Sequence, residues 1–213
     1  GNRHFKSSIN QAPRRYEDGW PGESGQFLFE LKSIADVGLV GYPNAGKSTL
    51  LNALSKARPK IGAYPFTTLE PMIGIIEFPD FRKVSVADIP GLIEGASEGR
   101  GLGHEFLRHV ERCSILLFVL DMAGSEGRDP YDDYALLRKE LKLYRAELAT
   151  RPSLILANKM DLPGAEENLA AFKKRVRRKV VTVSGGTGDG VEALKKVLRK
   201  AVEEKNASRE ERD

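Results

Sequence analysis

The fold of this chain is decided by the stretch Gly41-Tyr42-Pro43-Asn44-Ala45-Gly46-Lys47-Ser48, which has the G-x-x-x-x-G-K-[ST] form of a phosphate-binding loop. Its glycines let backbone amides turn toward an anionic oxygen, while Lys47 offers a charge to the phosphates and Ser48 a hydroxyl to Mg²⁺. The flanking runs predict a buried strand at 34–40 and a helix from 49, whose N-terminus adds partial positive charge. A plain glycine-rich turn is the alternative, and the Lys-Ser pair argues against it.

The base of the nucleotide is expected to be read by Asn158-Lys159-Met160-Asp161, which follows the apolar run 154–157. A carboxylate there can accept hydrogen bonds from N1–H and the 2-amino group of guanine. Adenine lacks both donors and would leave Asp161 unpaired, at a cost of about 1–3 kcal/mol. Asn158 is expected to hydrogen-bond the purine edge or neighbouring loops, and the Lys159 stem to cover the ring. The pattern alone also fits an ordinary turn, so its place downstream of a phosphate loop is what favours guanine.

Two further motifs point to the metal and to the γ-phosphate. Asp88-Ile89-Pro90-Gly91 ends an expected strand, where Asp88 can hold Mg²⁺ through water and the Gly91 amide can sense the γ-phosphate. Thr67-Thr68 precedes another strand, and a threonine there can close over Mg²⁺ when GTP is bound and release after hydrolysis. Either motif alone fits a surface turn. Four such motifs in this order are hard to explain as turns.

The motifs lie in longer stretches that resemble the Obg family of P-loop GTPases. Residues 88–112 read DIPGLIEGASEGRGLGHEFLRHVER, which is unusual among GTPases, and residues 64–69 read YPFTTL. Residues 1–14 are similar to the closing segment of the family's glycine-rich N-terminal domain. The resemblance extends to about Leu198 and omits most of that domain, so we expect a fragment of a longer protein.

The resemblance implies a Mg²⁺-dependent GTPase that cycles between GTP and GDP forms. It further implies action on the large ribosomal subunit and its rRNA, in assembly or in the stress response. We expect a monomer in a bacterial cytoplasm, or in an organelle matrix if the source is eukaryotic. Ser184-Gly185 stands where related GTPases usually carry Ser-Ala, with a backbone amide that touches guanine O6.

The residue after D-x-x-G is expected to limit the rate of hydrolysis. Many GTPases carry a water-orienting glutamine there, whereas this chain has Leu92. A hydrocarbon side chain cannot direct a water, so we expect slow hydrolysis that a partner or an ion accelerates. Asn44 raises the hypothesis that the ion is K⁺, because some related GTPases bind K⁺ through an asparagine at this place. The alternative is that Asn44 is a turn residue.

Together these motifs define one expected nucleotide site. The expected catalytic residues are Lys47, Thr68 and Gly91, and the expected metal ligands are Ser48, Thr68 and Asp88. The expected contacts to GTP or GDP are Gly41, Pro43, Asn44, Ala45, Gly46, Lys47, Ser48, Thr49, Phe66, Thr67, Thr68, Asp88, Gly91, Asn158, Lys159, Asp161, Ser184 and Gly185.

The alternation of apolar runs with helical stretches predicts an α/β fold. We expect a three-layer P-loop NTPase architecture, with a mostly parallel six-stranded sheet and helices on both faces. The expected strands are 34–40, 71–78, 82–88, 115–121, 153–158 and 179–183, the second and third forming an antiparallel hairpin. The expected helices are 46–56, 104–111, 131–149, 165–178 and 188–205.

Length and composition bound the domain organisation. The 213 residues suffice for one domain with a sizeable core. We expect a remnant of the glycine-rich domain or a linker at 1–30, the GTPase domain at 31–205 and a charged tail at 206–213. The lone Cys113 is expected to be a buried small hydrophobe, which suits a reducing compartment. No run approaches the roughly 20 apolar residues of a membrane span.

Charge and motif content leave alternatives for function. The net charge is only +4, yet basic residues crowd 173–179, which fits either an RNA-contacting surface or a solvated helix end. A nucleotide-gated binding module, in which hydrolysis is not the main output, stays open because of Leu92. A P-loop ATPase or kinase is a further alternative, and the Asn158–Asp161 motif argues against it.

Overall fold

The computed structural model describes two units of the chain, which divide after Leu31. The described residues are 2–14, 16–27, 34–56, 59–61, 71–89 and 109–210. Within the first unit, η1 (Asn2–His4) is a short 3-10 helix. The Ser7 hydroxyl then accepts a hydrogen bond from the Asn10 amide at 3.1 Å and closes a turn. The expected boundary near residue 30 is close to this division, while the origin of the first unit stays a prediction.

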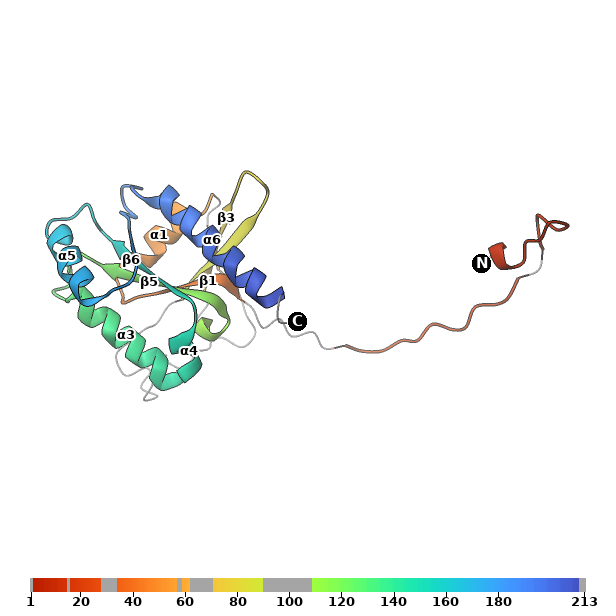
Figure 1. Cartoon of the computed structure of the whole chain (residues 1–213), viewed down its shortest axis with the longest axis horizontal. Coiled ribbons are helices and arrows are strands. Elements are labelled where there is room, and N and C mark those ends of the chain that lie inside the picture. The colour runs from red at the N-terminus through yellow and green to blue at the C-terminus, as the bar shows by residue number, and fades with distance from the viewer. Residues whose placement is uncertain are drawn as a thin grey trace. The chain divides into compact units, whose positions relative to one another are not determined.

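The second unit is built on a mostly parallel sheet with the order β2-β3-β4-β1-β5-β6-β7 (Figure 1). The parallel strands are β1 (Ala35–Val40), β4 (Lys83–Asp88), β5 (Cys113–Asp121), β6 (Ser153–Asn158) and β7 (Val180–Thr182). The antiparallel edge consists of β3 (Met72–Glu77) on β4 and the two-residue β2 (Lys60–Ile61) on β3. The expected α/β fold, its six strands and its hairpin are confirmed, and β2 adds a seventh strand.

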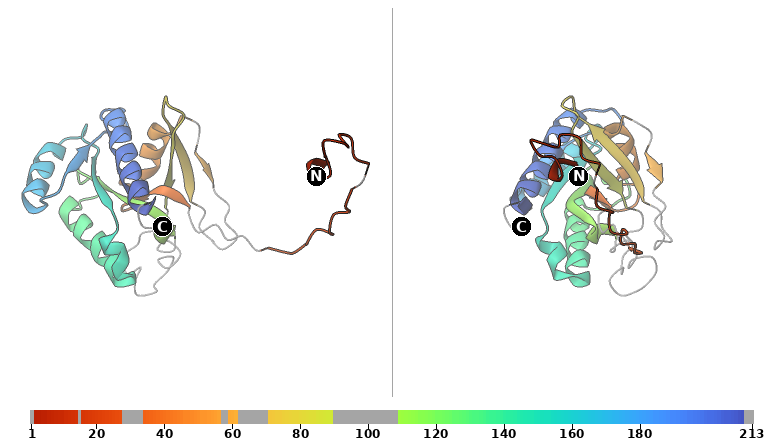
Figure 2. Two further views of the ribbon diagram at one scale, coloured as in Figure 1. Left: turned by 45° about the vertical axis from the view of Figure 1, so that its right-hand side comes forward. Right: turned by 90° about the vertical axis from the view of Figure 1, so that its right-hand side faces the viewer.

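Helices cover both faces of this sheet, because its central strands are apolar on both sides. On one face, α1 (Lys47–Leu54) and α6 (Val191–Glu210) bury leucines and valines against β1, β4 and β5. On the other face, α3 (Pro130–Tyr144), α4 (Ala146–Thr150) and α5 (Ala165–Arg175) pack on β5 and β6. Both views in Figure 2 keep these two helical layers apart. Cys113 is buried beneath the second layer, as expected, and burial raises the pKa of its thiol to about 12.

The helix expected at 131–149 is two helices in the structure. Asp129 caps α3 by accepting hydrogen bonds from the amides of Tyr131 and Asp132. Arg145 then adopts an extended conformation at φ −154° and ψ 120°, which ends α3 and begins α4. Beyond α4, the Arg151 guanidinium donates to three backbone carbonyls at the entry to β5. At the break itself, the Arg145 guanidinium forms an ion pair with Glu111, just before β5.

The bounds of the remaining helices also differ from expectation. α5 ends at Arg175 rather than at 178, and α6 runs past 205 to Glu210. Ion pairs between Arg199 and Glu203 and between Lys200 and Glu204, four residues apart, lie within the expected range. Beyond it, the Ser208 hydroxyl donates to the Glu204 carbonyl at 2.8 Å. Most of the helix expected at 104–111 lies outside the described residues, and its last residues from 109 are helical.

Candidate functional site

The loop at 41–46 joins β1 to α1 at the carboxyl edge of the parallel strands. Two of its glycines are required by close contacts. A Cβ on Gly41 would lie 2.5 Å from the Val119 carbonyl oxygen of β5. Gly46 has φ +90° and a Cβ there would lie 2.4 Å from the Asn158 side chain. The loop can therefore follow its path only with glycine at these two positions.

Lys47 opens α1 and folds back over the loop. Its ammonium donates to the carbonyl oxygens of Gly41 and Tyr42, each at 2.9 Å. Burial lowers the pKa of Lys47, and the negative charge of Asp88 opposes that shift. A partly buried cation among inward-facing loop atoms is an arrangement that attracts an anionic oxygen.

Ser48 and Asp88, predicted as metal ligands from distant parts of the sequence, meet in the structure. The Ser48 hydroxyl donates to Asp88 Oδ2 at 2.5 Å. In the described part of the chain, the other oxygen of Asp88, Oδ1, is buried without a hydrogen-bond partner. A buried carboxylate oxygen without a partner is costly in the absence of a ligand. This oxygen set therefore fits a hard divalent cation such as Mg²⁺.

Asn158 ties the loop at 41–46 to a second loop after β7. Its side-chain nitrogen donates to the Ala45 carbonyl at 2.8 Å, and its Oδ1 accepts from the Gly185 amide at 3.0 Å. The side chain is almost wholly buried. Of the two roles expected for Asn158, the structure shows the one that joins neighbouring loops.

Asp161 and Ser184 also lie together. The buried Ser184 hydroxyl donates to Asp161 Oδ1 at 2.6 Å and accepts from the Thr187 amide at 3.2 Å. Asp161 itself is exposed, so its carboxylate is oriented by Ser184 while it faces the open edge. A positioned and accessible carboxylate can accept a pair of hydrogen bonds from a ligand.

Sequence reasoning missed two supports of this edge. Asp121 ends β5 and accepts a hydrogen bond from the Lys159 ammonium at 2.8 Å, which fixes the side chain expected to cover the base. Asp121 could have been found from the sequence, because it is a polar residue that ends an apolar strand. Arg128 lies 3.8 Å from the Tyr42 ring centroid and donates to Asp133 at 2.7 Å. No sequence spacing links those three residues.

Asn44 has φ 58° and its side-chain nitrogen donates to Glu126 at 2.9 Å. Pro43 is exposed beside it, Ala45 is buried, and Thr49 is exposed on the first turn of α1. The other expected contacts, Phe66, Thr67, Thr68 and Gly91, lie outside the described residues, as does Leu92.

A family model described as a 50S ribosome-binding GTPase matches residues 36–159, which include the loop at 41–48 and reach Lys159. Curated relatives match at high identity across almost the whole chain. The GTPase Obg of Akkermansia muciniphila is 59% identical over 203 residues, which cover 95% of this chain and 58% of the relative. The chain belongs to the Obg family of GTPases. The expected resemblance is thereby confirmed.

A second relative also matches almost the whole chain but only part of its own length. The GTPase Obg of Opitutus terrae is 56% identical over 207 residues, covering 95% of this chain and 60% of that protein. The chain thus spans a little over half the length of these Obg relatives. The G domain of the T. maritima FeoB iron transporter shares the fold, with a TM-score of 0.58, 22% identity, and coverage of 78% of this chain and 96% of its own. Among the described helices, none combines the length and apolarity that a membrane span requires.

We predict that Gly185→Ala, which installs the alanine usual in related GTPases, is tolerated and stabilising. A Cβ there would lie 3.5 Å from Asn158 Oδ1 and from Leu50, an ordinary contact. Because alanine has fewer conformations than glycine in the unfolded chain, the substitution should add about 0.4–1 kcal/mol to the free energy of unfolding. Urea denaturation measures this, with Gly190→Ala as the contrast, because Gly190 has φ +77° and its Cβ would lie 2.4 Å from the Thr182 carbonyl. Equal destabilisation by both variants would contradict the prediction.

Proposed function

We propose that this chain binds GTP and GDP with Mg²⁺ and hydrolyses GTP slowly to GDP and phosphate. The observation that carries the proposal is the pair of hydrogen bonds made by Asn158, which hold a base-reading loop against a phosphate-binding loop. In this arrangement, the loop at 41–46 and Lys47 bind the phosphates. Asp161, oriented by Ser184, selects guanine by accepting from N1–H and the 2-amino group. Lys159 covers the ring from its anchored position on Asp121.

Ser48 and Asp88 are the described residues that would hold Mg²⁺, and Thr68 completes the proposed set. The ion supplies charge that offsets the negative charge of the phosphates. Lys47 contributes a second positive charge, and the Gly91 amide a hydrogen bond to the γ-phosphate. Thr68 would respond to the γ-phosphate and so distinguish the GTP form from the GDP form.

The chemistry of position 92 sets the expected rate. Leu92 stands where many GTPases carry glutamine, so this chain's own residues orient the attacking water poorly. We propose that K⁺ beside Asn44 accelerates the reaction. The Asn44 side-chain nitrogen donates to Glu126, and its carbonyl oxygen would be the ligand for K⁺.

In its biological setting, we propose a monomeric molecular switch on the large ribosomal subunit, in its assembly or in stress, in the bacterial cytoplasm. The support is the description of the matching family model as ribosome-binding and the bacterial origin of the Obg relatives. Residues 1–30 would be the end of a glycine-rich domain, 31–205 the GTPase domain and 206–213 a charged tail. A nucleotide-gated binding module is the second candidate, which Leu92 favours.

Asp161→Asn should shift nucleotide preference from guanine toward xanthine. The amide would offer a donor to the C2 oxygen of xanthine, whereas it would face the 2-amino group of guanine with a like donor. GTP affinity should fall about 10- to 100-fold, corresponding to about 1–3 kcal/mol. Calorimetric titration with GTP and with xanthosine triphosphate measures this, with Glu167→Gln as the matched exposed control. Unchanged GTP preference would move base recognition to other residues.

Hydrolysis should be faster in KCl than in NaCl by about tenfold, which is a barrier change of about 1.4 kcal/mol. Single-turnover assays at equal ionic strength measure the ratio. Asn44→Gly keeps the positive φ without strain but removes the side chain, so the ratio should fall to one. Glu126→Gln weakens only the partner of the Asn44 amide and should keep the K⁺ preference. Equal rates in both salts for the parent chain would remove the K⁺ role.

Single-turnover GTP hydrolysis with and without purified large ribosomal subunits separates the two candidate functions. A GTPase switch should show a rate that rises at least about tenfold with subunits. A binding module should cosediment with subunits in a GTP-dependent manner and show no such rise. Lys47→Ala is the control, because it removes the buried cation and should abolish nucleotide binding in both assays.

A further inference from the structure

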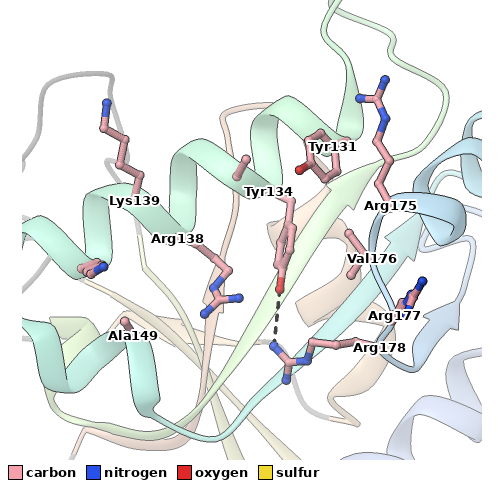
Figure 3. Close-up of a pocket in the computed structure, with 11 residues that line it drawn as sticks. Tyr131, Tyr134, Arg138, Lys139, Ala149, Arg175, Val176, Arg177 and Arg178 are labelled. Atoms are coloured by element: carbon pink, nitrogen blue, oxygen red, sulfur yellow. Dashed lines mark hydrogen bonds between the residues drawn. The ribbon is translucent and has the colours of Figure 1, made fainter.

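A basic groove, defined by Arg138, Lys139, Lys142, Arg175, Arg177 and Arg178, lies between α3 and the end of α5 (Figure 3). Its volume is about 580 Å³, and α4 closes one side through Ala149. All six cationic side chains are exposed. The sequence placed three of them in the basic run 173–179, and the fold adds three more from a helix over 30 residues earlier.

In the described part of the chain, no acidic side chain forms an ion pair with the cations of the basic groove. The groove lining contains no aspartate or glutamate. The helix dipole of α5 accounts for basic residues in its last turn, such as Arg175, but not for Arg138 and Lys139 on another helix. A chain with a net charge of only +4 has thus gathered uncompensated charge on one surface.

Neutral groups hold several of these cations in position. Arg178 donates to the carbonyl and the hydroxyl of Ser153. It also donates to the Tyr134 hydroxyl, the hydrogen bond drawn in Figure 3. The Arg175 guanidinium lies 4.8 Å from the Tyr131 ring centroid, and that of Arg138 lies 5.9 Å from the ring of Tyr134. These contacts orient the side chains while their full charge is kept.

The end of the basic groove formed by Arg178 lies at the opposite edge of the sheet from the nucleotide site. Arg178 precedes β7 and bonds Ser153 at the start of β6, so it marks the amino ends of the parallel strands. The loop at 41–46 and Asn158 follow the carboxyl ends of β1 and β6. An anion in the groove therefore occupies a site separate from that of the nucleotide.

We propose that the basic groove binds the phosphodiester backbone of RNA without reading its sequence. This inference deepens the proposed ribosomal function and rests on it for the choice of RNA. Arginines and lysines grouped without acids are the footprint of phosphate contacts. The two tyrosines of the lining already have partners, because Arg175 lies over the Tyr131 ring and Tyr134 is buried. Contacts are thus made to phosphates rather than to bases.

An acidic protein segment is a poorer fit to this groove. Stable protein interfaces depend on a few aromatic or apolar anchors in well-packed contacts. Among the larger lining residues, Tyr134 and Val176 are buried at 5% and 8% exposure, and the partly buried Tyr131 has the Arg175 guanidinium over its ring. The accessible surface is therefore that of charged head groups, which suits a polyanion.

The test uses the whole chain and a fluorescein-labelled, 20-nucleotide RNA of mixed sequence, with binding measured by fluorescence anisotropy. The variant Lys139→Gln/Lys142→Gln/Arg177→Gln removes three groove charges that make no hydrogen bond within the described structure. RNA affinity should fall tenfold or more, and the slope of log Kd against log[KCl] should decrease by about 2. The control Lys173→Gln/Lys174→Gln/Lys196→Gln removes three exposed helix charges outside the groove lining and should stay within about threefold of the parent chain.

The charge-preserving variant Lys139→Arg/Lys142→Arg/Arg177→Lys should bind RNA as the parent does. Equal losses in the groove and control variants, or no RNA binding by the parent, would overturn the proposal. Displacement of RNA by poly-L-glutamate at a lower charge concentration would also overturn it, in favour of an acidic protein partner. GDP affinity, measured in parallel, should be unchanged in every variant. Failure of the parent to bind GDP would refute the proposed function and leave the RNA result to stand separately.

Discussion

The site at the carboxyl edge of the sheet depends on one buried amide, the side chain of Asn158. It donates to the Ala45 carbonyl and accepts from the Gly185 amide, so it joins two loops that are more than 100 residues apart in sequence. Because both of its polar ends are satisfied, its burial costs little. The close approach of Gly46 to this side chain shows how tightly the loops are packed, since even one Cβ there would collide. The Asn158 side chain therefore fixes the loop at 41–46 relative to the loop after β7.

That amide can act only because the sheet brings the ends of its strands together. β1, β4, β5 and β6 are parallel neighbours, so Val40, Asp88, Asp121 and Asn158 all end at one edge. The apolar interiors of these strands place the sheet between two helical layers. β4, β5 and β6 end in the polar residues Asp88, Asp121 and Asn158. At this edge Asp88 accepts from Ser48, Asp121 accepts from Lys159, and Asn158 joins the two loops. The core and the site thus share one pattern, because three of these four apolar strands end in a polar residue.

This pattern explains why the sequence predicted so much of the fold and of the site. The strands were found because each is a short apolar run, and Ser48, Asp88, Asn158 and Asp161 because their motifs are local. Features that depend on distant contacts were missed. Arg145 breaks a helical run that no proline or glycine interrupts, and β2 is a two-residue strand that exists only by pairing with β3. The contact of Arg128 with Tyr42 joins residues that no spacing rule connects.

The two charged regions of the second unit differ in how their cations are treated. At the carboxyl edge, Lys47 is partly buried, donates to two carbonyl oxygens and lies close to the charge of Asp88. In the basic groove, Arg175 and Arg178 are exposed and contact neutral groups, so their field extends into solvent and is limited by salt. The first arrangement selects a compact anion by fit, and the second attracts an extended anion by charge. β6 carries a residue of each region, Asn158 at one end and Ser153 at the other.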